Sequence, residues 1–209
     1  MSKIVTVPDP VLRQMAKPVA KADKKLVDIV AEMTTTLLAA KNPEGVGLAA
    51  PQVGIPLRIF LIRPNPELPP QVFINPEIIK YSQRTVKPNR KSGVYEGCLS
   101  LPGHYSPVTR SASVTVKYQK LVQNSKSKSQ NSNQTPNSNL KIEKLGINSD
   151  IEISNLKLTE KIEVFTGFPA HIIQHEMDHL NGILFIDRVL EQNAKLYRVE
   201  GDDWREISL

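Results

Sequence analysis

The sequence contains a single cysteine, Cys98, among its 209 residues, so no internal disulfide can form. No stretch approaches the roughly 18 consecutive apolar residues that a transmembrane helix needs, and no association with a membrane is expected. The first residues lack the apolar run and the small-residue cleavage site of a signal peptide. Together these absences argue against a disulfide-stabilised secreted protein and predict a cytoplasmic location.

The overall composition is that of an ordinary globular protein, with 40% hydrophobic and 23% charged residues. A chain of 209 residues can hold one domain with a sizeable core, or at most two small ones. The formal net charge of +6 is modest. It is compatible with transient contact with the ribosome, but it does not argue for a nucleic-acid partner, and no DNA binding is expected.

An H-E-x-x-H motif stands in residues 174–182, where His175, Glu176 and His179 are followed by Asn181 and Gly182. On a helix, the two histidines lie about 40° apart on one face, one turn from each other. Two imidazoles so placed can share one metal ion, with the glutamate beside them as a proton acceptor. Asn181 and Gly182 mark the expected end of the helix, because both tolerate a left-handed backbone. The alternative is a surface helix that carries two histidines by chance.

Cys98 lies between a glycine and a leucine, and its residue type leaves three interpretations open. A lone cysteine is most often a small buried hydrophobe. It can also be a nucleophile or a metal ligand. The third interpretation gains weight because the two histidines lack a third protein partner.

Residues 45–54 contain three glycines and two alanines, and Gln52 lies in the same segment. Such small residues let the backbone approach a ligand or another element closely, although a purely structural turn explains them as well. A phosphate-binding loop is disfavoured, because no Gly-Lys-Ser/Thr ending and no preceding strand are present.

The remaining pattern predicts a mixture of helices and strands. Residues 22–41 follow helical spacing, with Asp23 near the start, and a second helix is expected after Gly167. The strand-like segments are 57–63, 72–81, 113–118, 151–153 and 156–165. Near the end of the chain, Leu196, Tyr197 and Val199 are expected to anchor the tail before it turns polar.

Residues 121 to about 150 form a polar insert rich in Asn, Ser and Lys. Its central part has no apolar residue, so burial cannot offset the entropy that ordering would cost. We expect a flexible loop within a hairpin, and therefore a single domain over 1–209 with one insert.

Three separated segments together resemble the signature motifs of the peptide deformylases, in the order that the family has them. They are Gly45-Val46-Gly47-Leu48-Ala49-Ala50-Pro51-Gln52, Glu96-Gly97-Cys98-Leu99-Ser100 and Gln174-His175-Glu176-Met177-Asp178-His179. The resemblance extends to residues 8–13 and 184–188. It implies an α+β fold with mixed and antiparallel strands packed around a central helix that carries H-E-x-x-H.

The resemblance also implies an enzyme that removes the N-terminal formyl group from new polypeptides beginning with formyl-methionine. It implies one divalent metal ion bound by Cys98, His175 and His179; Fe(II) is favoured, and Zn, Ni or Co also suit these ligands. Glu176 would be the general base, and the Gln52 amide and the Leu99 backbone N–H would form an oxyanion hole. The residues that would bind the substrate are Val46, Gly47, Val94, Phe168 and Ile172.

Some features depart from the family or admit a rival. His171 stands where an arginine is frequent, and we give it a structural role at a partly exposed position. Arg110 and Asp178 are predicted to form an ion pair behind the metal helix. An ordinary H-E-x-x-H metalloprotease would need a further ligand such as Glu191 or Glu200, and it would not need Cys98. A catalytically inactive binding relative is a second rival, disfavoured because every catalytic position is filled.

Overall fold

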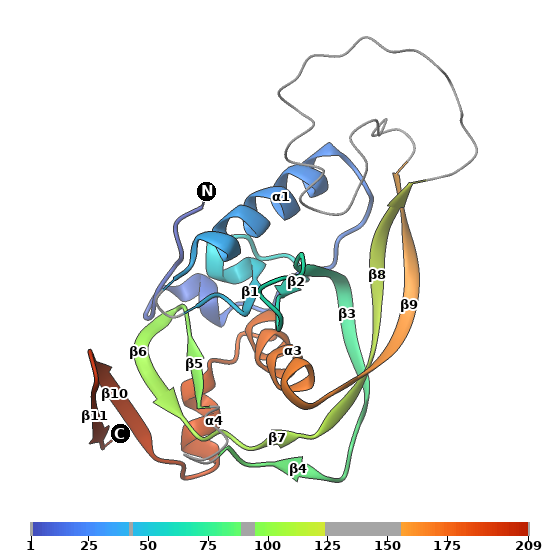
Figure 1. Ribbon diagram of the computed structural model, residues 1–209. Helices are drawn as coiled ribbons and strands as arrows, with labels where there is room; N and C mark the ends of the chain where they lie inside the picture. Colours follow the sequence, from blue (N-terminus) through green and yellow to red (C-terminus); the bar gives the residue numbers. More distant parts are fainter. Residues whose placement is uncertain (1, 42–43, 89–94, 124–155, 209) are drawn as a thin grey trace.

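The computed structural model describes residues 2–41, 44–88, 95–123 and 156–208 (Figure 1). A five-stranded antiparallel sheet has the order β1-β2-β3-β8-β9, and a four-stranded one has the order β11-β10-β6-β5. The strands of the first sheet are β1 (Gly47–Ala49), β2 (Ile59–Ile62), β3 (Gln71–Tyr81), β8 (Ser113–Gln123) and β9 (Leu156–Thr166). The others are β5 (Glu96–Cys98), β6 (Leu101–Ser106), β10 (Leu196–Glu200) and β11 (Asp203–Ile207), with β4 (Thr85–Val86) pairing β7 (Arg110–Ser111). An α+β fold with antiparallel sheets is thereby confirmed.

The described helices are few. They are α1 (Lys24–Ala39), α3 (Gly167–Leu180) and α4 (Phe185–Glu191), with short 3-10 turns η1 (Pro10–Arg13) and η2 (Ala50–Val53). The predicted helix over 22–41 is α1, which is shorter because Asp23 caps it by accepting a hydrogen bond from Leu26 N at 3.0 Å. Its Met33 and Leu37 are fully buried against Leu48 and the strand β2.

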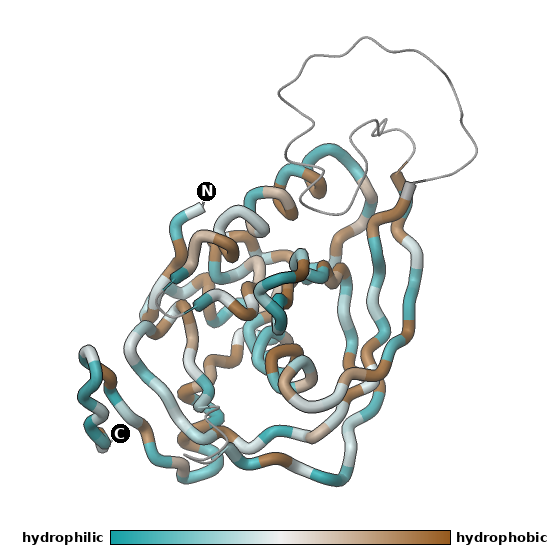
Figure 2. Tube along the Cα trace, viewed as in Figure 1, coloured by the Kyte–Doolittle hydropathy of each residue, from teal (hydrophilic) through white to brown (hydrophobic). Residues whose placement is uncertain are grey.

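The predicted hairpin around the polar insert is present. Strands β8 and β9 pair over their whole length, from Ser113 opposite Thr166 to Gln123 opposite Leu156. Brown and teal segments alternate along both strands in Figure 2, as expected for strands that bury one face. The predicted strand at 151–153 and nearly all of the insert lie outside the described residues.

Helix α3 packs against β1, β2, β8 and β9, and nearly every side chain from Ala170 to Leu180 is buried. It begins at Gly167 (φ +62°) and ends before Gly182 (φ +72°). Asn181 keeps a right-handed backbone (φ −101°), so only Gly182 fulfils the expectation of a left-handed end. A Cβ atom at Gly182 would lie 2.5 Å from the carbonyl oxygen of Arg13, which fixes α3 against η1.

The tail differs from the expectation. Instead of a few anchors followed by polar chain, residues 196–207 form the hairpin β10–β11, and Tyr197 of β10 pairs with Tyr105 of β6. Tyr197 and Val199 lie on one face of β10, and Leu196 lies on the other. The exposed charged residues Arg198 and Glu200 follow Leu196 on its face and interrupt the apolar pattern, which concealed the strand.

Candidate metal centre and active site

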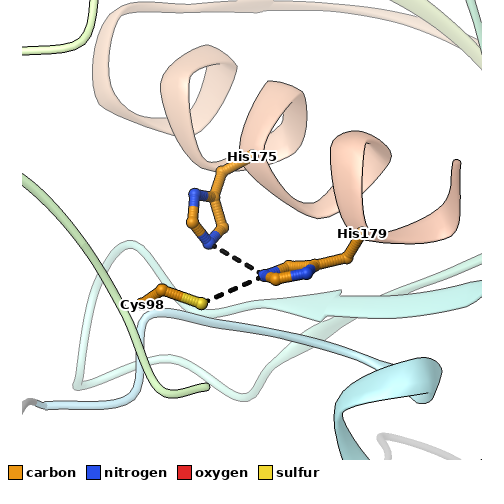
Figure 3. A group of neighbouring side chains, drawn as sticks. All are labelled: Cys98, His175 and His179. Carbon is orange, nitrogen blue, oxygen red and sulfur yellow. Dashed lines mark hydrogen bonds between the residues drawn. The ribbon is translucent and has the colours of Figure 1, made fainter. Parts of the chain in front are cut away.

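Cys98, His175 and His179 converge on one point between β5 and α3 (Figure 3). Their donor atoms all lie within 4.8 Å of one another, and all three residues are buried. The Nε2 atom of His179 is 3.2 Å from the sulfur of Cys98 and 3.1 Å from Nε2 of His175. One thiolate and two imidazoles around an open position match the donor set of a catalytic divalent metal ion.

The protonation state of the Cys98 thiol suits metal binding. Burial by itself raises the pKa of the Cys98 thiol, but the adjacent His179 and His175 lower that pKa to about 5. The sulfur also accepts hydrogen bonds from the Gln52 side-chain amide (3.5 Å) and from Ser100 N (3.4 Å). Both donors stabilise the thiolate, which is the form that binds a metal. The cluster therefore fits a cation.

Glu96 holds His175 in place. A carboxylate only accepts hydrogen bonds, so Nδ1 of His175 donates to Glu96 Oε1 at 2.7 Å and Nε2 is left with its lone pair toward the cluster. Arg110 donates two hydrogen bonds to Glu96, from Nε to Oε2 at 3.0 Å and from Nη2 to Oε1 at 2.7 Å. Nε2 of His171 lies 2.8 Å from Glu96 Oε2. Burial raises the pKa of the Glu96 carboxyl, but Arg110 and His175 hold that pKa well below its usual range.

The predicted ion pair between Arg110 and Asp178 is confirmed. Nη1 of Arg110 lies 2.6 Å from Asp178 Oδ2, and both side chains are buried. Arg188 binds the same carboxylate through two bonds of 3.0 and 2.6 Å. Removing one partner of such a buried pair typically costs about 3–5 kcal/mol, because a charge is left uncompensated. The network Glu96–Arg110–Asp178 thus fixes α3 to β5 and β7.

Glu176 lies beside the three candidate ligands and is 2% exposed. Its Oε2 atom is buried and has no hydrogen-bond partner among the described residues. Burial raises the pKa of Glu176 to about 7, against the opposing effect of His175 and His179. A Cβ atom at Gly47 would lie 2.2 Å from Glu176 Oε1, so the glycine gives the carboxylate its space. An unpaired carboxylate oxygen at this place can accept a proton from a bound water molecule.

Hydrogen bonds at both ends of its side-chain amide orient Gln52. Its Oε1 accepts a hydrogen bond from Ala49 N at 2.8 Å, which directs Nε2 toward Cys98 and Ser100 Oγ (3.3 Å). The side chain is 1% exposed, so the amide has little freedom to turn. It therefore presents a fixed donor at the cluster.

A cavity of about 230 Å³ opens beside the cluster. Of the predicted site residues, those that line it are Val46, Gly47, Gln52, Cys98, Leu99, Phe168, Ile172, His175 and Glu176. His179 does not line the cavity, and it is 1% exposed. Phe168 is 39% exposed at the mouth, whereas Ile172 is buried. Val94 lies outside the described residues.

The cavity lies between the edges of the two larger sheets. Strand β1, with Gly47, is at one end of the five-stranded sheet, and β5, with Cys98, is at one end of the four-stranded sheet. An edge strand offers backbone donors and acceptors to an added strand.

Sequence reasoning missed the role of Glu96, although this residue belongs to the motif that contains Cys98. Its partners lie 14 to 79 positions away in the chain, so no local pattern indicates the contacts. The one available signal was a charged residue two positions from a candidate ligand. His171 is partly exposed, as predicted, and its contact with Glu96 was not predicted. Glu191 and Glu200 pair with Arg188 and Arg198 on the surface and do not belong to the cluster, which disfavours a metalloprotease.

None of the helices in the described part of the chain has the length and hydrophobicity required to span a lipid bilayer.

Comparison with known proteins points to one family. The sequence model of the family described as polypeptide deformylase matches residues 1–133 and 148–195. A peptide deformylase of Mesorhizobium japonicum is 35% identical over 189 residues, which is 89% of this chain and 82% of that protein. The crystal structure of peptide deformylase from Thermotoga maritima matches with a TM-score of 0.64 and 34% identity, over 90% of this chain and 97% of that one.

A third match is a peptide deformylase from Synechococcus elongatus in complex with actinonin, at 32% identity and a TM-score of 0.64, covering 90% of this chain and 79% of the other. The family match covers most of the chain and includes all three motifs, two of which hold the candidate ligands. These similarities in sequence and in fold agree with one another, and the chain belongs to the peptide deformylase family, a family of hydrolases.

Proposed function

We propose that this protein is a metal-dependent hydrolase that removes the N-terminal formyl group from new polypeptides beginning with formyl-methionine. The observation that carries the proposal is the convergence of Cys98, His175 and His179 next to the unpaired carboxylate oxygen of Glu176, beside one cavity. Family membership supports the reaction and the requirement for a metal ion. These three residues would hold the ion, which would supply the Lewis acidity that activates water and polarises a carbonyl oxygen.

The residues of the chain divide the remaining work. Glu176 accepts the proton of the attacking water and passes it to the departing amine nitrogen. The Gln52 amide and the Leu99 backbone N–H donate to the oxygen that becomes negatively charged; losing one such donor typically costs about 3–4 kcal/mol in barrier. Glu96 keeps His175 in the tautomer that leaves Nε2 free for the ion.

The substrate would bind as an added strand. The Val46–Gly47 backbone at the sheet edge would hold the peptide in extended form, and the apolar side chains of Val46, Phe168 and Ile172 would receive the methionine. Val94 is proposed for the same pocket from the resemblance alone. The helix that carries H-E-x-x-H is α3, and its contacts with both β1 and β8 support a central position in one catalytic domain over 1–209, with the insert at about 121–150. Cytoplasmic location and transient ribosome contact remain proposals that follow from the substrate.

Gly47→Ala is expected to lower kcat/KM by about a hundredfold, because the added methyl group displaces the carboxylate of Glu176. The bound metal and the melting temperature should change little. Formate release, metal content and thermal unfolding of the same preparation check this. A Cβ at this position would also lie 2.8 Å from Ile172 Cγ2, so the control compares Gly47→Ala combined with Ile172→Ala against Ile172→Ala alone. Equal activity of these two variants would assign the loss to the contact with Ile172 and contradict the role given to Gly47.

We propose Fe(II) as the native metal. One thiolate and two imidazoles suit zinc as well, but Fe(II) expands its coordination more readily when the formyl oxygen arrives. Apo protein reconstituted anaerobically should turn over formyl-Met-Ala-Ser faster with Fe(II) than with Zn(II), and activity of the iron form should decay in air as iron and the Cys98 thiolate oxidise. Nickel or cobalt should preserve activity and slow the decay. Equal or better turnover with zinc would overturn the iron assignment, and absence of formate with every metal would overturn the function.

A further inference from the structure

Four aromatic side chains gather on one face of the four-stranded sheet, and we call them the aromatic wall: Tyr95, Tyr105, Tyr197 and Trp204. The Trp204 ring centroid lies 5.3 Å from that of Tyr105, 5.4 Å from that of Tyr95 and 6.1 Å from that of Tyr197. Tyr95 and Tyr197 are 5.6 Å apart in an edge-to-face arrangement. Only 5% of the residues in this chain are aromatic, and its single tryptophan lies here. The wall is therefore a concentrated apolar feature.

The strand register puts these side chains on one face. Tyr197 of β10 lies opposite Tyr105 of β6, and Val199 of β10 lies opposite Trp204 of β11. Directly opposed residues share a face, as do residues two apart on one strand. Gly97 lies opposite Tyr105, and a Cβ atom there would be 2.6 Å from the Tyr105 ring. The Tyr105 ring therefore lies over the glycine, toward the cavity.

The wall continues the lining of the active-site cavity outward. Tyr95 and Tyr105 line the cavity together with Cys98 and Glu176, and Trp204 extends the same surface to the outside, where it is 44% exposed. In Figure 1 the hairpin β10–β11 lies next to β6, at the end of the chain. The opposite face of this sheet is already occupied, because it packs against α4 through a core cluster of Cys98, Val108, Phe185, Val189 and Leu196.

Charge on the hairpin does not suggest a charged occupant. The basic side chains in the hairpin and directly before it pair with acidic ones of the hairpin, namely Lys195 with Glu206, Arg198 with Glu200 and Arg205 with Asp203. A large exposed ring beside a substrate cavity is a typical anchor for an apolar group. Because the aromatic wall continues the lining of the active-site cavity, the occupant that fits it best is the part of the substrate that extends out of the cavity.

We infer that the aromatic wall binds an aromatic or large apolar side chain of the substrate peptide downstream of its formyl-methionine, with Trp204 as a specificity-determining residue. The inference rests on the proposed function. A peptide held at the β1 edge has its first residue in the cavity, and its following residues pass the mouth that Tyr95 and Tyr105 border. Ring contacts of this kind contribute enough for a preference of about three- to tenfold.

The test compares peptides by formate release from the full-length metal-loaded protein. The reference is formyl-Met-Ala-Ala-Ala, and three further peptides carry phenylalanine at the second, third or fourth position. Wild type should prefer phenylalanine by about three- to tenfold in kcat/KM at one of these positions. Trp204→Ala should reduce that ratio below about twofold, and Trp204→Phe should retain most of it. Arg205→Ala is the matched control, because the Arg205 side chain follows Trp204 in the chain but points away from the wall. This substitution should leave the ratio unchanged.

A second readout uses Trp204 itself, because it is the only tryptophan in the chain. The preferred phenylalanine peptide should change tryptophan emission at concentrations where the all-alanine peptide does not. Absence of any preference in wild type, together with unchanged emission, would overturn the inference, as would equal loss on all peptides in Trp204→Ala. A wild-type dimer that Trp204→Ala converts to a monomer would assign the wall to a second copy. If no peptide loses formate, the proposed function fails, and emission alone still decides whether peptides contact the wall.

Discussion

Glu176→Gln is expected to lower turnover by about a thousandfold or more while the protein keeps its metal, because an amide cannot accept the proton of the attacking water. The substitution preserves size and removes only the charge and basicity of a side chain that is 2% exposed. The unpaired Oε2 atom and the pKa of about 7 are what a group that both accepts and returns a proton needs near neutral pH. Formate release and metal content, measured on one preparation, check the result.

Glu191→Gln serves as the matched control for this variant. Glu191 is exposed, pairs with Arg188 and would be the extra ligand in an ordinary H-E-x-x-H metalloprotease. Its substitution should leave turnover within about twofold, as is typical of surface changes. Substantial activity in Glu176→Gln with metal retained would contradict the assignment of the base. Loss of metal in Glu191→Gln would revive the rival.

Cys98→Ala is expected to lose metal affinity first, by more than about a hundredfold, since changes that only disturb the support of a ligand already cost 10- to 100-fold. Activity should then return only at a large excess of metal. Cys98→Ser is the size-matched control, because it fills nearly the same space yet is a poor thiolate substitute. If alanine and serine variants both bind metal at wild-type stoichiometry and affinity, Cys98 is not a ligand.

The sequence predicted the elements whose signals are local. Helical spacing and the Asp23 cap indicated α1 with an error of two residues at each end, and period-two patterns indicated β3 and the hairpin β8–β9. The three motifs contain the residues that meet around the cluster. In the structure, residues of β1, β5 and α3 line one cavity, although these elements are separated by tens of residues in the chain.

What the sequence did not predict depends on contacts across the fold. Glu96 organises the site only because folding places Arg110, His171 and His175 around it. The hairpin β10–β11 escaped notice because charged residues interrupt its apolar pattern, and its pairing partner β6 lies about ninety residues earlier in the chain. The aromatic wall likewise arises from register among strands β6, β10 and β11 and has no motif of its own.

The most direct test of the account is X-ray absorption spectroscopy of the metal in protein that is purified anaerobically and then loaded with one equivalent of zinc. The account predicts one metal ion per chain, with one sulfur neighbour at about 2.3 Å and two imidazole nitrogens at about 2.0–2.1 Å. The sulfur must come from Cys98 or a methionine, and its disappearance in Cys98→Ser identifies the source. A stoichiometric metal ion surrounded only by nitrogen and oxygen would contradict a site built from Cys98, His175 and His179.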